Sequence, residues 1–358
     1  MNDKVNVLIT CAASQIMPSV IKLIRKYEKR EIRVIGIDSK PLNLSIGGYY
    51  CDSFYKAPMG HEREYLDFIK KLIQKESINI IFPGSDEEVI ELSKIKEYLK
   101  KHNCHVTCSS EKITNIAADK YKMLCKLQKN DIPVGKFYNP QSLDDFQKAA
   151  KDLGYPAKKF ILKPKKGRGS KGLRIVSSKN IDRYENFLLN KNFNTNLEEI
   201  VTLFKDYPDK IKDFVLMEYF PGDKYSADVL VSNGEVKSMV IRNNWKELKI
   251  NPPTQLADIV FDEDVREYST KICNLLKFDY FIQIETGRGE DGKPYYIETN
   301  PRLDATTPIT TGLGINFYHE MIDYAIQGHF NDDIDVLNNK LNKNLRFFRF
   351  WDHTFVEV

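Results

Sequence analysis

The sequence has little of what marks a secreted, membrane-spanning or nucleic-acid-binding protein. Its 358 residues include six cysteines, too few in a chain of this length for a disulfide framework. No apolar run approaches the roughly 18 residues of a membrane span. The 54 Lys and Arg residues nearly balance 50 Asp and Glu residues, so the net charge of +4 gives no argument for nucleic acid. No cleavable signal is visible at the N-terminus, and we expect a protein of the reducing cytoplasm.

Glycine is missing where a dinucleotide site would need it. The first strand pattern, at residues 6–10, is followed by the sequence CAASQIMP. Asp38 ends the second strand pattern, where dinucleotide-binding folds often place an acid. The G-x-G-x-x-G fingerprint is nevertheless absent, so we predict no NAD site.

A zinc site is also not expected. Cys104, His105 and Cys108 lie close together, but no second ligand pair follows at zinc-site spacing. A buried strand with core cysteines is the preferred interpretation.

The order of strand and helix patterns predicts the architecture. Strand-like and helix-like stretches alternate over residues 5–108, which favours a parallel sheet with helices on its faces. Strands are expected at 6–10, 33–38, 78–84 and 105–108, and helices at 16–27, 64–74 and 86–99. Residues 111–210 are more helical, and residues 211–300 are mostly strand-like with a helix at 264–276. A last helix is expected at 310–327, then a polar loop at 331–344 and an aromatic final strand.

The most informative stretch is QIETGRGEDGKPYYIETNPR, residues 283–302. Asp291-Gly292 is suited to a two-residue hairpin turn, which would pair Glu290 with Lys293. That register sets Glu285 opposite Glu298, and Gln283 opposite Asn300, all on one face. Hard oxygen ligands of this kind suit Mg²⁺ that also holds substrate phosphates. Arg302 follows, ready to contact a phosphate or an anionic substrate. The alternative is a solvated polar face on an edge hairpin.

A second stretch, FILKPKKGRGSKGLRIV at residues 160–176, predicts a strand, a glycine-rich loop and a returning strand. Glycines let backbone N–H groups approach phosphate oxygens. The loop contains Gly167, Gly169, Ser170, Lys171 and Gly172, and Lys163 lies at the end of the first strand. The P-loop motif is absent, so we predict a hairpin lid over a triphosphate, with an exposed basic turn as the alternative.

A third stretch, MEYFPGDKYSADVLV at residues 217–231, carries Glu218, Tyr219 and Phe220 at a strand end. Such a segment can offer backbone groups and apolar area to an adenine ring. The alternative is an ordinary strand edge.

These three stretches, in this order, resemble the ATP-grasp superfamily, and in particular the carbamoyl-phosphate synthase large subunit and its stand-alone relatives. The resemblance covers about residues 15–325 and includes PGSDEE at 83–88. It implies an α/β fold in which a Rossmann-like parallel-sheet domain precedes a two-lobed α+β ATP-grasp domain. The implied boundaries are a pre-ATP-grasp domain at 1–110, a lid-bearing lobe at 111–210, a lobe with the adenine strand and metal face at 211–330, and an extension at 331–358.

The resemblance also implies roles for individual residues. Lys120 and Lys163 would contact ATP phosphates, the lid would be residues 167–172, and Glu218, Tyr219 and Phe220 would hold adenine. Gln283, Glu298 and Asn300 would bind Mg²⁺, with Glu285 added from the hairpin register. Arg302 would lie near the transferred phosphate, and Arg242 would be a substrate-side arginine on a looser alignment.

Two departures from the family pattern affect these expectations. Lys224 stands where relatives usually have an acid that holds the ribose, so Asp223 takes that place or the contact is lost. The run Leu303 to Thr307 replaces small residues and glycines after Asn-Pro-Arg. Asp304 could therefore meet a substrate amine, or Asp304 or Thr306 could simply cap a helix.

The resemblance implies an ATP-dependent carboxylate–amine ligase that uses an acyl phosphate and Mg²⁺, with two ions expected and Mn²⁺ as a substitute. Its partners would be a small carboxylate and an amine, without nucleic acid or membrane, and a homo-oligomer is compatible with the sequence. One alternative is phosphorylation of bicarbonate or carbamate, as in carbamoyl-phosphate synthases. Another is a non-catalytic nucleotide-binding subunit.

Overall fold

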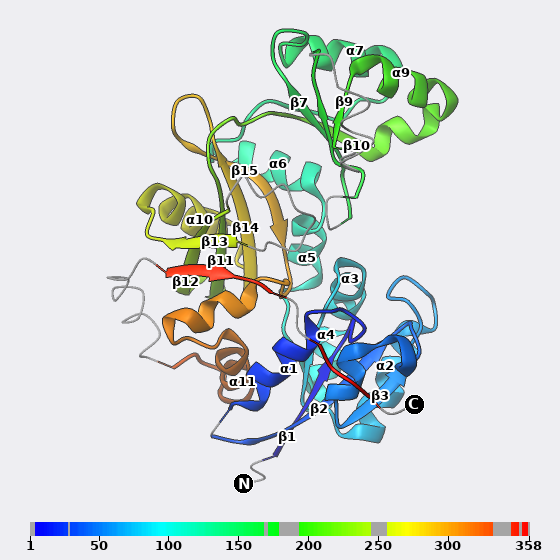
Figure 1. The fold of residues 1–358 in the computed structure, drawn as a ribbon, viewed down its shortest axis with the longest axis vertical. Coiled ribbons are helices and arrows are strands. Elements are labelled where there is room, and N and C mark those ends of the chain that lie inside the picture. The colour runs from blue at the N-terminus through cyan, green and yellow to red at the C-terminus, as the bar shows by residue number, and fades with distance from the viewer. Residues whose placement is uncertain are drawn as a thin grey trace. The chain divides into compact units, whose positions relative to one another are not determined.

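The computed structural model in Figure 1 describes residues 4–27, 29–167, 171–178, 193–244, 256–331, 345–350 and 353–356. The chain forms two compact units. The first contains Met1–Ala118, Asp223–Glu285 and Glu298–Val358, and the second contains Asp119–Gly222 and Thr286–Ile297. The four domain ranges expected from the sequence stay a prediction.

The N-terminal part of the first unit is a parallel sheet, as predicted. Its strands follow the order β3-β2-β1-β4-β5. They are β1 (Lys4–Ile9), β2 (Glu31–Asp38), β3 (Ser53–Lys56), β4 (Ile80–Phe82) and β5 (His105–Val106). The helices are α1 (Met17–Arg25), α2 (Tyr65–Glu76), α3 (Asp86–Lys94), α4 (Lys96–Lys101) and α5 (Glu111–Ala117), with short 3₁₀ turns η1 (Leu42–Leu44) and η2 (Ile46–Tyr50).

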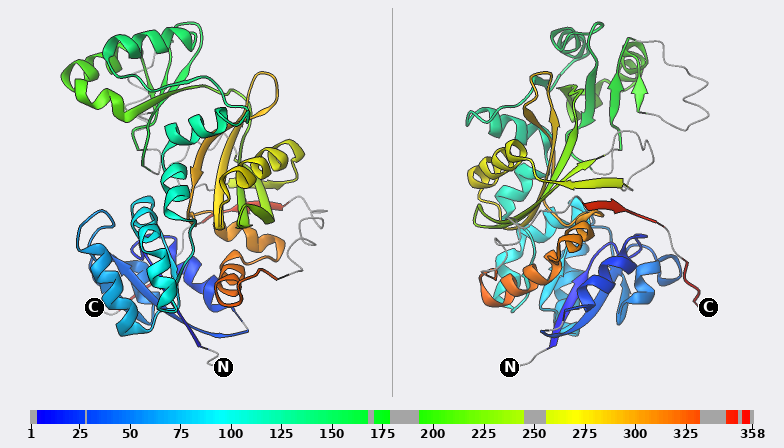
Figure 2. Two further views of the ribbon diagram at one scale, coloured as in Figure 1. Left: turned by 180° about the vertical axis from the view of Figure 1, so that it is seen from behind. Right: turned by 60° about the vertical axis from the view of Figure 1, so that its left-hand side comes forward.

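Side-chain alternation along β1 explains why helices cover both faces of this sheet (Figure 2). Val7 and Ile9 pack into the hydrophobic core that contains Val20 and Ile24 of α1. Leu8 points the other way, into the cluster that contains residues of α2 and α3. A strand that is buried on both faces is typical of a parallel sheet.

A second sheet belongs mainly to the first unit, in the order β15-β14-β11-β12-β13-β16. Its strands are β11 (Lys224–Ser232), β12 (Glu235–Asn244), β13 (Leu256–Val260), β14 (Tyr280–Arg288), β15 (Pro294–Asn300) and β16 (Leu345–Phe348). The helix α10 (Glu263–Leu276) packs against β11 and β12. After β15 come the 3₁₀ helix η4 (Thr307–Leu313) and α11 (Phe317–Gln327), and α11 shares a hydrophobic core with α1.

The second unit is built around a third sheet, in the order β6-β10-β7-β8-β9. Its elements are α6 (Lys120–Gln128), β6 (Phe137–Tyr138), α7 (Leu143–Asp152), β7 (Phe160–Pro164), β8 (Arg174–Val176), β9 (Asn194–Thr195), α9 (Leu197–Asp206), η3 (Pro208–Asp213) and β10 (Phe214–Glu218). Phe146 of α7 and Phe204 of α9 meet edge to face at 5.2 Å and join the core with Phe160 of β7. β7 and β8 pair antiparallel, which confirms the predicted strand–loop–strand order around the glycine-rich segment.

The structure corrects some of the predicted boundaries. The helix expected at 86–99 is broken at Ile95, where φ −109° and ψ 11° leave the helical region. The helix expected at 310–327 is likewise interrupted, because Gly314 adopts a left-handed conformation and Asn316 caps a new helix. The predicted final strand is confirmed as β16, whereas most of the loop expected at 331–344 lies outside the described residues. Among the helices that the structure describes, none is long and apolar enough to cross a membrane.

Candidate active site

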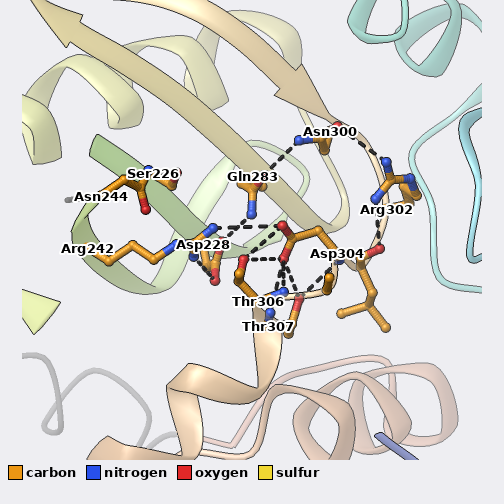
Figure 3. Close-up of polar contacts among 12 residues, drawn as sticks. Ser226, Asp228, Arg242, Asn244, Gln283, Asn300, Arg302, Asp304, Thr306 and Thr307 are labelled. Atoms are coloured by element: carbon orange, nitrogen blue, oxygen red, sulfur yellow. Dashed lines mark hydrogen bonds and ion pairs between the residues drawn. The ribbon is translucent and has the colours of Figure 1, made fainter. Parts of the chain in front are cut away.

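A chain of buried polar side chains crosses four strands of the second sheet (Figure 3). Arg242 of β12 contacts Asp228 of β11 at 2.6 Å between Nη1 and Oδ2. Gln283 of β14 donates from Nε2 to Asp228 Oδ1 at 3.0 Å, and Asn300 of β15 donates from Nδ2 to Gln283 Oε1 at 2.7 Å. These groups are almost fully buried, and each is hydrogen-bonded to the next, so the chain of side chains is held as a unit.

The contact between Gln283 and Asn300 places the two amides face to face, but the hairpin turn differs from the prediction. The Gly289 N–H donates to the Lys293 carbonyl at 2.9 Å, and the Gly292 N–H donates to the Gly289 carbonyl at 3.1 Å. The turn therefore contains three residues, Glu290 to Gly292, rather than Asp291-Gly292 alone. Gly292 takes the left-handed position with φ +75°, as expected for a three-residue hairpin loop. The predicted pairing of Glu290 with Lys293 is wrong.

Arg302, two residues beyond Asn300, is fixed from both sides. Its Nε donates to Asp86 Oδ1 at 2.8 Å, and its Nη2 reaches Asn300 Oδ1 at 3.4 Å. Nη1 donates to the Leu303 carbonyl at 3.1 Å. Asp86 is the first residue of α3 and is buried, so the N-terminal sheet domain supplies a carboxylate that orients this guanidinium.

Asp304 serves mainly to hold its own loop. Its carboxylate accepts from the backbone N–H groups of Thr306 and Thr307 at 2.8 and 3.0 Å, and from the Thr306 hydroxyl at 2.7 Å. Arg242 lies 3.8 Å away through Nη2. These contacts order the loop before η4, whose N-cap residue is Thr306 and has no side-chain capping hydrogen bond.

The two acids that share Arg242 titrate differently. Burial raises the pKa of Asp228 to about 6, assisted by the nearby Asp304 charge and opposed by Arg242. Burial also acts against ionisation of Asp304, but Arg242 and the Thr306 hydroxyl hold the pKa of Asp304 below its usual value. Arg242 stays charged because Asp228 and Asp304 outweigh its own loss of solvation and raise its pKa.

The donor set of the hairpin fits a magnesium ion that is completed by phosphate. Glu285 and Glu298 are partly exposed carboxylates, and Gln283 and Asn300 add amide oxygens. Among the described residues, no group of three or more His, Cys, Asp or Glu side chains could hold a metal ion. Two carboxylates with amides match Mg²⁺, which usually binds through one or two carboxylates and fills its remaining positions with water and phosphate. Gln283 is the most constrained of the four, because both ends of its amide are already hydrogen-bonded.

The predicted phosphate-binding residues lie in the second unit, where two of them meet. Lys120 begins α6, and its Nζ donates to the Gly167 carbonyl at 3.0 Å. Lys163 is buried on β7, opposite Val215 of β10. Gly167 has φ +118°, a conformation that residues with a side chain rarely adopt. Gly169 and Ser170 lie outside the described residues, and Lys171 begins the described part again.

The predicted adenine strand belongs to the same unit. Glu218 ends β10, and its Oε2 accepts from the Lys136 N–H at 3.0 Å. Phe220 stacks on Tyr295 at 5.0 Å between ring centroids, and the Lys159 ammonium lies 5.6 Å from the centre of the Tyr219 ring. The segment is therefore held by contacts within its own unit, and one face of the Phe220 ring is covered by Tyr295. Asp223 and Lys224 follow at the start of the next stretch of the first unit.

Cys104 and Cys108 behave as core residues. Cys104 and Cys108 are fully buried, and burial raises the pKa of each thiol to about 12. A thiol held so far from ionisation is a poor zinc ligand. Asp38, the acid at the end of β2, accepts from the Ala13 and Lys40 N–H groups at 2.8 and 2.9 Å and so orders its own loops.

Comparisons with known proteins find two matching family models. Residues 210–343 match the family described as "ATP-grasp in the biosynthetic pathway with Ter operon", and residues 7–107 match the "PylC-like, N-terminal domain". The chain therefore resembles an ATP-grasp family over residues 210–343 and a PylC-like N-terminal domain over residues 7–107. This confirms the resemblance and the fold class that the sequence predicted.

Individual relatives are distant. The carbamoyl phosphate synthase large chain of Clostridium acetobutylicum is 24% identical over 284 residues, which cover 76% of this chain and 24% of that protein. The same protein of Thermotoga petrophila is 22% identical, with 81% of this chain and 25% of the relative covered. The chain thus spans about a quarter of the length of these relatives.

Solved structures share the fold at lower identity. The N5-carboxyaminoimidazole synthetase of Staphylococcus aureus complexed with ADP has a TM-score of 0.67 and 16% identity, covering 91% of this chain and 78% of that one. The biotin carboxylase domain of the Hydrogenobacter thermophilus 2-oxoglutarate carboxylase, with MgADP and bicarbonate, has a TM-score of 0.67 and 17% identity, covering 91% and 70%. An L-amino acid ligase from Bacillus licheniformis has a TM-score of 0.63 and 16% identity, covering 90% and 74%.

Sequence reasoning did not find Asp228 and Asp86, the two acids that hold the site's arginines. Asp228 lies inside the strand pattern at 225–231. An isolated acid between apolar residues of a strand indicates a buried carboxylate that needs a partner, and this was the signal that could have identified it. Asp86 lies 216 positions from Arg302, and nothing local connects them.

Proposed function

We propose that this protein is an ATP-dependent carboxylate–amine ligase that works through an acyl phosphate. The observation that carries the proposal is the buried chain from Arg242 through Asp228, Gln283 and Asn300 to Arg302. It sets two guanidiniums along a sheet that also bears Glu285 and Glu298. Fixed cations and hard oxygens are what phosphoryl transfer requires, since its catalysis depends on positioning and electrostatics.

In this proposal the carboxylate oxygen of the substrate attacks the γ-phosphorus of ATP, the bond to the β,γ-bridging oxygen breaks, and ADP leaves. An amine then attacks the acyl carbon, phosphate leaves, the amine gives up a proton, and an amide remains. Arg302 and Lys163 stabilise the transferring phosphoryl, and Arg242 orients the acid substrate.

ATP binding is assigned to the following residues. Lys120, Lys163 and the loop Gly167, Gly169, Ser170 and Lys171 hold the phosphates, and Glu218, Tyr219 and Phe220 hold adenine, with Asp223 on the ribose. Gln283, Glu285, Glu298 and Asn300 hold Mg²⁺, which neutralises phosphate charge when bound. Two ions are proposed, with Mn²⁺ as a substitute. Support comes from the fold shared with structures that contain ADP or MgADP. A cytoplasmic location stays a prediction.

The test is phosphate release from Mg-ATP with pooled carboxylic acids and amines, ammonia and bicarbonate included. Glu298→Ala removes a proposed metal ligand, and Glu235→Ala is the matched control, because Glu235 is exposed at the start of β12 and pairs only locally with Lys237. Release that depends on one acid and one amine, lost in Glu298→Ala and kept in Glu235→Ala, supports the ligase.

The same assay separates a second candidate. Release with bicarbonate and ammonia alone would favour a carbamoyl-phosphate type of reaction, which the similarity to carbamoyl phosphate synthase large chains supports. ATP binding without turnover on any pool would instead favour a non-catalytic nucleotide-binding subunit and overturn the ligase proposal.

A further inference from the structure

A cavity of about 710 Å³ lies within the first unit, beside the loop that carries Arg302 and Asp304. Ala305 and Pro308 of that loop form one wall. The start of α1 and η2 form another, including Ile16, Lys22 and Tyr50. The volume lies within the roughly 300–1,000 Å³ of ordinary small-molecule sites.

The remaining wall comes from the C-terminal aromatic segment, defined here as residues 345–350 and 353–356. Phe347, Arg349 and Phe355 line the cavity from this segment. β16 pairs antiparallel with β13, and Arg346 holds Asp258 through two hydrogen bonds of 2.6 and 3.0 Å. The strand part of the segment, Leu345–Phe348, is therefore held in register. It also lies beyond residue 343, where the ATP-grasp family match ends.

Arg349 is the feature that indicates a ligand. Its Nη2 donates to the Ala305 carbonyl, and its guanidinium lies 5.5 Å from the centre of the Phe347 ring. Its Nη1 is buried and has no hydrogen-bond partner among the described residues. A buried charged donor without a partner costs free energy, so a bound anion at this position would be favourable.

The Nε of Arg242 is a second buried donor of this kind. Arg242 is 2% exposed, and its Nε has no hydrogen-bond partner among the described residues. Asp304 links the two arginines electrostatically, because both Arg242 and Arg349 interact with its charge. The cavity therefore combines aromatic walls with the buried Nη1 of Arg349, whereas Arg242 is not among the residues that line it.

We propose that this cavity binds the acid substrate, a carboxylic acid with an aromatic or branched apolar body, and that Arg349 pairs with its carboxylate. The inference rests on the proposed ligase function and names the class of its acid. The apolar body packs against Phe347, Tyr50 and Ile16. Arg349 is thus a specificity-determining residue that the C-terminal aromatic segment supplies.

The test measures binding, so that it does not depend on turnover. Calorimetry on the full chain compares 3-phenylpropionate with acetate and with the neutral 3-phenylpropionamide, with and without a non-hydrolysable ATP analogue and Mg²⁺. We expect 3-phenylpropionate to bind at least about tenfold more tightly than either analogue, since one lacks the apolar body and the other lacks the charge.

Two variants and one control locate the site. Arg349→Gln should weaken binding of 3-phenylpropionate at least about tenfold and leave the amide unchanged. Ser19→Trp fills the cavity from an exposed position on α1 and should abolish binding while Arg349 stays in place. Arg346→Gln, on the same strand, should bind as the wild type does, because that side chain pairs with Asp258.

The proposal is overturned if Arg349→Gln and Ser19→Trp bind the acid like the wild type, or if acetate or the amide binds equally well. Circular dichroism of each variant excludes misfolding as the cause of a loss. Binding of the acid without ATP turnover would leave this inference standing and remove the ligase function. Turnover on small acids alone, without binding of the aromatic acid, would support the ligase function and overturn this inference.

Discussion

Arg302 and Asp86 form an ion pair of 2.8 Å that joins the loop after β15 to the first residue of α3. Both side chains are about nine-tenths buried. The N-terminal sheet domain thereby sets the direction of the arginine that is proposed to meet the transferred phosphate.

Asp86→Asn should lower kcat while changing the KM for ATP little, because it releases Arg302 without removing it. The loss of a carboxylate that orients a functional group typically costs roughly 10- to 100-fold. Steady-state kinetics would show this split. Asp67→Asn, which removes an exposed acid of α2, serves as the control. An unchanged kcat in Asp86→Asn would contradict the orienting role.

Arg242→Met should destabilise the fold strongly, since it leaves Asp228 buried without its cation. Breaking a buried pair from one side costs about 3–5 kcal/mol. Denaturant unfolding measures the change. The double variant Asp228→Leu with Arg242→Met should recover most of the loss. If the second substitution does not restore stability, the pair stabilises the fold by more than the mutual neutralisation of its two charges.

The stability contributed by Asp228 should depend on pH in an unusual direction. Its folded pKa of about 6 lies above the usual value of an aspartate, so the folded state binds the proton more tightly. This contribution is fully present below about pH 4 and is lost as the pH rises through about 6. The difference in unfolding free energy between the wild type and Asp228→Asn should therefore shrink or reverse between these values. A difference that grows with pH would mean that Arg242 holds the carboxylate ionised.

Gly167→Ala should weaken ATP binding because it strains the backbone of the loop, and not because the added methyl group clashes with a neighbour. A Cβ at Gly167 would meet no atom of the described residues within 4 Å, but φ +118° is strained for alanine. Such strain amounts to about 1–3 kcal/mol. Gly292→Ala is the matched control, with φ +75° and nothing within 4 Å, but in the β14–β15 turn. Calorimetry should show weaker nucleotide binding in Gly167→Ala alone. Equal affinities would argue against a role of this loop in binding phosphate.

The sequence predicted those parts of the fold that local periodicity determines. Residues 6–10 and 33–38 are strands because apolar and β-branched residues are bounded by polar turns, and the helices between them follow a 3.6-residue repeat. The same reasoning placed Gln283 near Asn300. The sequence predicted a two-residue turn because Asp291-Gly292 is a common dipeptide of such turns. Gly292 is equally suited to the left-handed last position of a three-residue loop, which is what the structure has.

What the sequence could not show depends on contacts between distant segments. The strand β13 is short and was missed, yet it pairs with β12 on one side and β16 on the other. Arg242 was expected near the substrate, but its burial against Asp228 arises only when β11 and β12 pair. The role of Arg349 is visible only after the C-terminal segment has been placed beside Ala305.

The acids that hold the arginines leave the site without surplus positive charge. Three carboxylates, those of Asp86, Asp228 and Asp304, face the guanidiniums of Arg242 and Arg302, and Glu285 and Glu298 lie on neighbouring strands. A nucleotide triphosphate approaching this sheet would meet a local charge of its own sign. The negative charges of the carboxylates and of the nucleotide phosphates would then have to be balanced by bound cations. Divalent ions would offset this charge for a nucleotide at the sheet.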